Sequence, residues 1–350
     1  MPLPLERRRQ LQALGLRALI KRRFGPEVGS AARVVPYGGG AAIVAGAAPE
    51  AAGLLAAVFA DSPTGLGSAV DLAAREGAGH LYFFAELNTP AVARRAAEFA
   101  LPVTVVDPGG DFQALESEPH RAIAPPPSRL ASAREWLRAA GLDVEWEDGV
   151  LLGELLGLEV ARATDLGLEG VVLDVGVGKH DREANRLLYP DGPTDELLAH
   201  AVSVVAELRR PNAPVHPANQ LAPERWLRAV IRNQPSLVGL DAVRSGPSPE
   251  PRPDLRGRSV APGWGYDAAG EAVVVACSVG VDPDVVALAA DARLQAPAWP
   301  DFPSSERPAR LLIVVPEGDD HPLTRRVAGL LTGPADVVTV AADWRAQALR

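Results

Sequence analysis

The sequence predicts an α/β protein with mixed sheets and flanking helices, in which two similar outer modules surround a different central module. Continuous apolar runs, typical of strands covered on both faces, alternate with helical stretches, and this order recurs near both ends of the chain. The run around Ile43 has a counterpart around Val274, and the run around Leu81 has one around Leu312. The separation from Ile43 to Val274 equals that from Leu81 to Leu312. Equal spacing of this kind indicates an internal repeat.

The N-terminal module begins with a helix over residues 6–23, because leucines recur at helical spacing between charged side chains. A β-hairpin follows, since the strands at 32–35 and 41–45 flank a glycine turn. The outer modules are expected to continue from this hairpin as helix, strand, helix and strand. In the first module these elements are a helix over 49–60, a strand over 81–84, a helix over 90–99 and a strand over 103–106.

The C-terminal module repeats this plan after a helix over 223–231. Its hairpin has a turn at 267–270, and proline near the first turn marks the start of each later helix. Proline-rich segments separate modules of residues 1–124, 128–212 and 213–350. The remaining C-terminal elements are a strand over 272–276, a helix over 283–293, a strand over 311–315, a helix over 322–331 and a strand over 337–340.

The central module carries the best candidate site. We expect a helix over 130–140, a short strand at 144–146, long strands over 150–163 and 170–178, and helices that begin at Asp181 and Thr194. If Ala163 pairs with Gly170, Glu159 lies opposite Asp174 on a face of glycine and alanine that leaves room for a ligand. Two opposed carboxylates need a cation, a shared proton or a hydrogen-bond donor between them.

Glycines lead from the second long strand into the next helix. Backbone N–H groups at a helix start can bind an anion, and the neighbouring Lys179 and His180 would add positive charge. Gly176, Gly178 and His180 are therefore the predicted ligand-binding residues. The alternative interpretation is glycine packing beside a solvated carboxylate pair, with Asp181 as the helix N-cap.

Composition and charge bound the classes of function. The single cysteine excludes an internal disulfide and cysteine-rich zinc sites. No apolar run reaches about 18 residues, so we expect no membrane span, and the N-terminal segment lacks the apolar core of a signal peptide, which predicts a cytoplasmic protein. The net charge of −9 argues against sequence-independent DNA binding, although the basic segments 6–24 and 201–260 leave nucleic acid open as a partner. The sequence also leaves a homo-oligomer open.

The central order of helix, three strands and helix, with acids on the second and third strands, resembles the core of the restriction-endonuclease-like (PD-(D/E)XK) nucleases. The resemblance implies that Glu159, Asp174 and Lys179 are catalytic, with Glu159 and Asp174 binding Mg²⁺ or Mn²⁺ to orient water for phosphodiester cleavage. The family's Glu-x-Lys pattern would fall on Ala276 and Ser278 in the C-terminal module, which removes the metal ligand and the lysine. The equivalent N-terminal strand has no acid, and Lys179 is displaced by three residues from the central motif.

Two functions follow from these observations. The first is a non-catalytic protein of nuclease-like fold that serves in binding or assembly, which the lost catalytic pattern in both outer modules favours. The alternative is a metal-dependent phosphodiesterase or nuclease that uses the central acidic pair.

Overall fold

The computed structural model describes residues 4–46, 53–61, 65–85, 89–106, 113–120, 122–211, 213, 216–250, 259–305 and 307–347. These residues form helices and three sheets of five, four and five strands, which confirms the predicted mixed α/β class. The chain divides into two compact units. Unit 1 comprises Met1–His120, Val281–Asp291 and His321–Val337, and unit 2 comprises Arg121–Gly280, Ala292–Asp320 and Val338–Arg350.

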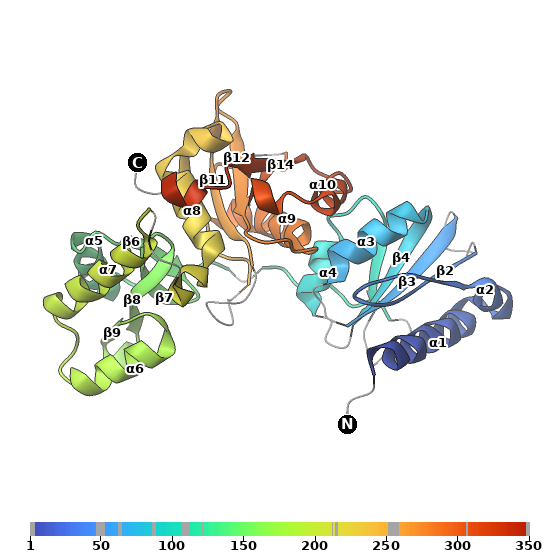
Figure 1. The fold of residues 1–350 in the computed structure, drawn as a ribbon, viewed down its shortest axis with the longest axis horizontal. Coiled ribbons are helices and arrows are strands. Elements are labelled where there is room, and N and C mark those ends of the chain that lie inside the picture. Colours follow the sequence, from blue (N-terminus) through green and yellow to red (C-terminus); the bar gives the residue numbers. More distant parts are fainter. Residues whose placement is uncertain are drawn as a thin grey trace. The chain divides into compact units, whose positions relative to one another are not determined.

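Unit 1 is built on a mixed sheet of strand order β1-β2-β3-β4-β5 (Figure 1). The first three strands form an antiparallel meander, and β4 and β5 then add in parallel. The elements in chain order are α1 (Leu5–Phe24), α2 (Pro26–Ala31), β1 (Arg33–Val35), β2 (Gly40–Ala45), β3 (Leu54–Ala60), α3 (Leu66–Arg75), β4 (Ala78–Ala85), α4 (Pro90–Ala96) and β5 (Val103–Val106).

The predicted helix over 49–60 is wrong where the structure describes it, because Leu54–Ala60 is the strand β3. β3 lies in the middle of the sheet and is buried on both faces, so its sequence shows no alternation of polar and apolar residues. A short apolar run of this kind, rich in alanine, suits a helix and a buried strand equally well. The helix that follows, α3, was not predicted.

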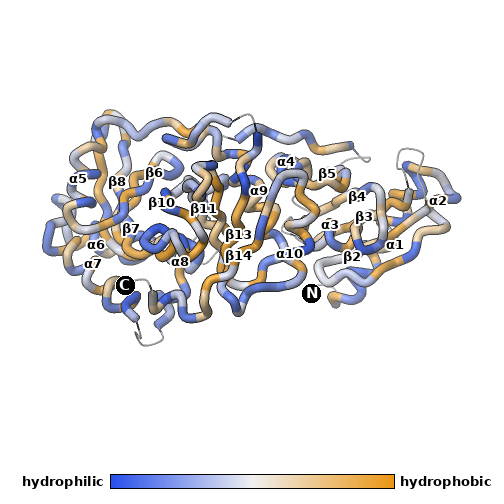
Figure 2. The backbone as a smooth tube through the Cα atoms, turned by 90° about the horizontal axis from the view of Figure 1, so that it is seen from above, coloured by the Kyte–Doolittle hydropathy of each residue, from blue (hydrophilic) through white to orange (hydrophobic). Residues whose placement is uncertain are grey.

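Helix α1 covers one face of this sheet and has the predicted extent within a residue at each end. Its buried side chains Leu16 and Ile20 pack with Ile43 and Leu55 in one hydrophobic cluster. Burial of a leucine or isoleucine side chain stabilises a fold by about 1.5–3 kcal/mol. In Figure 2 the strands that α1 covers are largely hydrophobic, whereas α1 alternates between hydrophobic and hydrophilic positions.

Unit 2 contains the central module, an antiparallel sheet of order β6-β7-β8-β9. Four strands occur here where three were expected, because a tight turn at Leu156–Gly157 divides the predicted strand 150–163 into two. Both turn residues have positive φ, 49° and 74°, as a two-residue hairpin of this type requires. The elements are α5 (Ala131–Ala139), β6 (Asp143–Glu147), β7 (Val150–Leu155), β8 (Leu158–Asp165), β9 (Val171–Val175), α6 (Gly178–Leu188) and α7 (Asp195–Arg209).

The third sheet has the order β10-β11-β12-β13-β14. As in unit 1, an antiparallel meander of three strands is followed by a strand that pairs in parallel. The elements are α8 (Pro223–Asn233), β10 (Leu240–Ser245), β11 (Ala261–Asp267), β12 (Ala272–Cys277), α9 (Val285–Gln295), β13 (Arg310–Pro316), α10 (Pro322–Ala328) and β14 (Ala335–Val340).

The two five-stranded sheets therefore share their order, but the predicted alignment of strands is wrong at one position. The run 41–45 forms β2, the second strand of its sheet, whereas 272–276 lies in β12, the third strand. By topology β12 corresponds to β3, in which no acid and no lysine occurs. Leu81 and Leu312 do lie in corresponding strands, β4 and β13.

Candidate functional site

The central hairpin does not pair in the predicted register. Arg162, and not Glu159, lies opposite Asp174, and Ala163 lies opposite Leu173 instead of Gly170. The prediction failed because it ended the strand at Ala163, whereas β8 continues to Asp165, which pairs with Val171 across a shorter loop. The turn at Leu156–Gly157 instead brings Glu159 opposite Glu154 of β7.

A bulge restores Glu159 to the side of the sheet on which Asp174 lies. The β7–β8 register shifts so that Ala161 pairs with Gly153 but Glu159 pairs with Glu154, which leaves Val160 as an extra residue. Such an extra residue changes the side to which the following residues point. Glu159 and Arg162 consequently meet, although they are three residues apart in a strand.

Three arginines neutralise the two acids. Arg162 donates two hydrogen bonds to Glu159, from Nε to Oε1 at 2.6 Å and from Nη2 to Oε2 at 2.8 Å, and Arg182 Nη1 donates to Oε1 at 2.9 Å. Arg186 binds Asp174 in the same two-pronged way, with 2.6 Å between Nη2 and Oδ2. Paired, parallel hydrogen bonds of this kind are the strongest that arginine and a carboxylate form.

The residues present do not fit a divalent metal. Glu159 and Asp174 are buried, and all four of their carboxylate oxygens accept hydrogen bonds from guanidinium groups. Mg²⁺ and Mn²⁺ need free oxygen ligands in near-octahedral geometry. Within the part of the chain that the structure describes, no group of three histidine, cysteine or acidic side chains could hold a metal ion.

Lys179 and His180 belong to a different cluster. Helix α6 begins at Gly178, three residues earlier than predicted, so both residues lie in its first turn. Their side chains are 79% and 99% exposed and pair with Glu183, with 3.6 Å between Lys179 Nζ and Glu183 Oε1. The structure thus brings the predicted acids together with arginines, and the predicted lysine and histidine together with another acid.

Of the two predicted glycines, Gly176 precedes α6 and has a structural role, whereas Gly178 is the first residue of the helix and has φ of +80° with open space beside it. The amide of Gly176 donates to the carbonyl oxygen of Val160 at 2.8 Å, so it is engaged within the sheet. A Cβ at Gly176 would lie 2.9 Å from the backbone nitrogen of Arg182, so only glycine allows α6 to approach this closely. Asp181, the predicted N-cap, lies inside the helix, and Val177 holds the capping position.

Unit 2 holds a cavity of about 630 Å³ beside the arginine cluster. It lies along β9, the edge strand of the central sheet, and β9 lines it over its whole length. The opposite side is formed by α6 and the segment after it, with Arg182, Arg186 and Tyr189 in the lining. The cavity therefore lies beside the edge strand β9, and its lining has as many arginines as acids, namely Arg182, Arg186, Asp174 and Asp191.

A second buried ionic network was missed by the sequence prediction. Glu154 is only 2% exposed and accepts hydrogen bonds from Arg225 and Arg228, the second at 3.3 Å. Arg225 also binds Glu147. Burial lowers the pKa of Arg225, but the charges of Glu154 and Glu147 outweigh it and raise the pKa above its ordinary value. The sequence signal that could have revealed this network is the helical spacing of Arg225, Arg228 and Arg232 on α8, of which the first two are buried.

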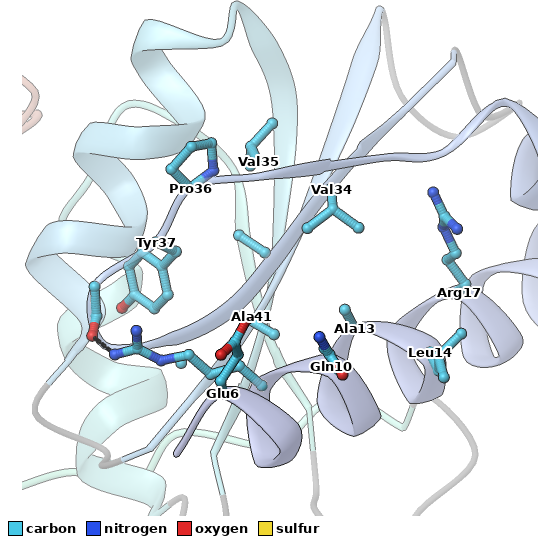
Figure 3. Close-up of a pocket in the computed structure, with 14 residues that line it drawn as sticks. Glu6, Gln10, Ala13, Leu14, Arg17, Val34, Val35, Pro36, Tyr37 and Ala41 are labelled. Carbon is cyan, nitrogen blue, oxygen red and sulfur yellow. Dashed lines mark hydrogen bonds between the residues drawn. The ribbon is translucent and has the colours of Figure 1, made fainter. Parts of the chain in front are cut away.

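A larger cavity lies in unit 1, between α1 and the hairpin β1–β2 (Figure 3). Its volume is about 780 Å³, and α1, β1 and β2 all contribute apolar side chains to it. The polar side chains are few and come mainly from α1. The lining residues are Glu6, Arg9, Gln10, Ala13, Leu14, Arg17, Val34, Val35, Pro36, Tyr37, Gly38, Gly40, Ala41 and Ala42.

Cys277 is fully buried in β12, and burial raises the pKa of its thiol to about 12. A thiol in this state is not a nucleophile near neutral pH.

No described helix is long and apolar enough to cross a membrane. Comparisons with models of protein families, with curated proteins and with solved structures found no match to this chain.

Proposed function

We propose that this chain is a non-catalytic binding or assembly protein with nuclease-like outer modules. The observation that carries the proposal is the pairing of Glu159 and Asp174 with three arginines, which occupies the oxygens that a catalytic metal would need. A carboxylate held by a guanidinium on both oxygens serves the fold more readily than it serves a metal.

The topology of the outer modules supports the nuclease-like part of the proposal. Each has a helix, three antiparallel strands, a second helix and a parallel strand, in the segments α1 to β4 and α8 to β13. The central module has four antiparallel strands instead, so it is the less similar of the three. The strands β3 and β12, which precede the second helix, contain neither an acid nor a lysine.

The cavity along β9 supports the binding part. β9 is an edge strand, and an edge strand can pair with an extended segment while a pocket beside it selects side chains. Arg182 and Arg186 line this cavity together with Asp174 and Asp191, so its charges balance and do not by themselves select a charged segment.

The basic segment 201–260 of unit 2 is poorly suited to bind nucleic acid. Among the described residues of 201–260, Arg225 and Arg228 bind buried acids, and Arg209 is fully buried with its guanidinium over the Trp226 ring. Arg210 and Arg244 are half exposed and pair with Glu207 and Asp301. Arginines that already face carboxylates or the core cannot neutralise phosphates.

A metal titration tests the proposal against the phosphodiesterase alternative. We expect Mg²⁺ and Mn²⁺ to leave the melting temperature of the full chain unchanged, because a bound ion stabilises only the state that binds it. A metal-dependent rise that disappears in Glu159→Ala but persists in Glu183→Ala would establish the alternative. Glu183 is a suitable control because it is exposed and pairs with Lys179 at the surface. Cleavage assays with single- and double-stranded DNA and RNA should correspondingly show no metal-dependent product.

A further inference from the structure

We propose that the groove between α1 and the β1–β2 hairpin binds a single-chain anionic amphiphile, of which a medium-chain fatty-acid carboxylate is the simplest member. The groove lies wholly in unit 1 and shares no residue with the acidic pair. The proposal adds a ligand class to the binding function proposed above. It depends on different residues, so either can fail while the other stands.

The walls of the groove are apolar and partly uncovered. Leu14 of α1 is 61% exposed, and Val34 of β1 is 53% exposed, although both line the same cavity. Figure 3 shows them on facing elements, and the buried Ala13 and Ala41 form the floor of the groove. Large apolar side chains that face one another across a cavity of a few hundred Å³ are typical of sites for apolar ligands. An alkyl chain would cover both side chains at once.

The charges are arranged unequally along the groove. At one end Arg9 donates to the carbonyl oxygen of Gly38, and Glu6 lies one helical turn away, so positive and negative groups occur together. Arg17 lies two turns further along α1, about 12 Å along the helix axis. No acidic side chain of the lining lies at that end. A ligand with one negative group is therefore expected to place it at Arg17.

The position of Arg17 suits a carboxylate. Its Nη2 donates to the carbonyl oxygen of Ala32 at 2.8 Å, which holds the guanidinium at the rim of the groove. A guanidinium carries five N–H donors, so others can meet both oxygens of a carboxylate in a paired arrangement. The ligand's chain would then run from Arg17 past Leu14 towards the apolar floor.

Two other anionic partners fit the groove less well. A bilayer surface would contact the outward face of α1, where Leu11 is exposed but lies outside the groove lining. A nucleic acid needs a series of cations along its phosphates, whereas this groove presents a single arginine without an acid beside it.

Calorimetric titration of the full chain with dodecanoate, below its micelle concentration, tests the proposal. We expect saturable binding to one site, with little binding of butyrate, which lacks the chain, or of dodecyltrimethylammonium, which reverses the charge. Arg17→Gln and Leu14→Asp should each weaken dodecanoate binding about tenfold or more, because hydrogen bonds to a charged group and apolar contact are lost.

The chain offers matched controls on the same helix. Arg7→Gln and Leu11→Asp make the same chemical changes outside the groove and should alter dodecanoate affinity by no more than about twofold, the range expected for a surface charge. Circular dichroism of each variant checks that α1 remains folded. The proposal is overturned if dodecanoate does not saturate, or if the control variants lose as much affinity as the groove variants. Binding of phosphatidylglycerol vesicles or a DNA duplex in place of dodecanoate would also overturn it.

Discussion

Replacement of Glu154 by glutamine should destabilise unit 2 far more than loss of one surface charge. The substitution keeps the side-chain shape but removes the charge that faces Arg225 and Arg228, both of which are buried. Two hydrogen bonds to charged groups are weakened, each worth about 1.5–3 kcal/mol. Removal of one partner from a buried pair typically costs 3–5 kcal/mol, because the other charge stays buried. We therefore expect a loss of about 3–5 kcal/mol.

Thermal unfolding provides the measurement. For a unit of 150–250 residues, about 1 kcal/mol corresponds to a shift in melting temperature of 2–4 °C, so Glu154→Gln should lower it by roughly 6–20 °C. The fluorescence of Trp146 and Trp226, which both lie in unit 2, can report the transition. Glu183→Gln removes the same charge from an exposed pair with Lys179 and should cost at most about 0.5 kcal/mol. Equal shifts in the two variants would refute the argument.

Two further predictions concern glycine positions and acid stability. Gly157→Ala should lower the free energy of unfolding by at least about 1–2 kcal/mol, because φ is +74° and the new Cβ would lie 2.2 Å from the carbonyl carbon of Arg225. Gly15→Ala, in open space on α1, should raise it by about 0.5–1 kcal/mol. Urea unfolding measures both changes. Burial raises the pKa of Asp291, but hydrogen bonds from His120 and neighbouring arginines outweigh it and lower the pKa to about 2. The stability that this carboxylate contributes is present above the ordinary carboxyl pKa and is lost as the pH falls towards 2. Asp291→Asn should flatten this part of the stability profile, and an unchanged acid slope would contradict the assignment.

The elements predictable from sequence are those with a local signal. Helix α1 follows from the spacing of its leucines, and the β11–β12 hairpin follows from its turn ending in Gly270. These signals lie within a few residues of one another, so they survive whatever packs on top. The strand β3 had no such signal, because a central strand covered on both faces loses the alternation that would distinguish it from a helix.

The candidate site depended on register, which the sequence does not encode locally. Gly157 was the available sign of a turn inside the supposed long strand, but the leucine before it is an unusual residue for positive φ. The bulge at Val160 then moved Glu159 by one position. Arg182 and Arg186, one helical turn apart on α6, could have been recognised as a basic pair, but nothing in the sequence connects them to acids in the sheet.

Charge pairing, which the sequence does not show, also bears on function. A count of charges along the chain treats each group as available, whereas the folded chain cancels many of them in pairs. The acids at 159 and 174 and the arginines at 225 and 228 are cancelled within unit 2. A charge can attract a ligand only where the fold leaves it beside an accessible surface without an opposite partner. By that criterion Arg17 in the groove of unit 1 is a better candidate for ligand binding than the acidic pair on which the sequence concentrates attention.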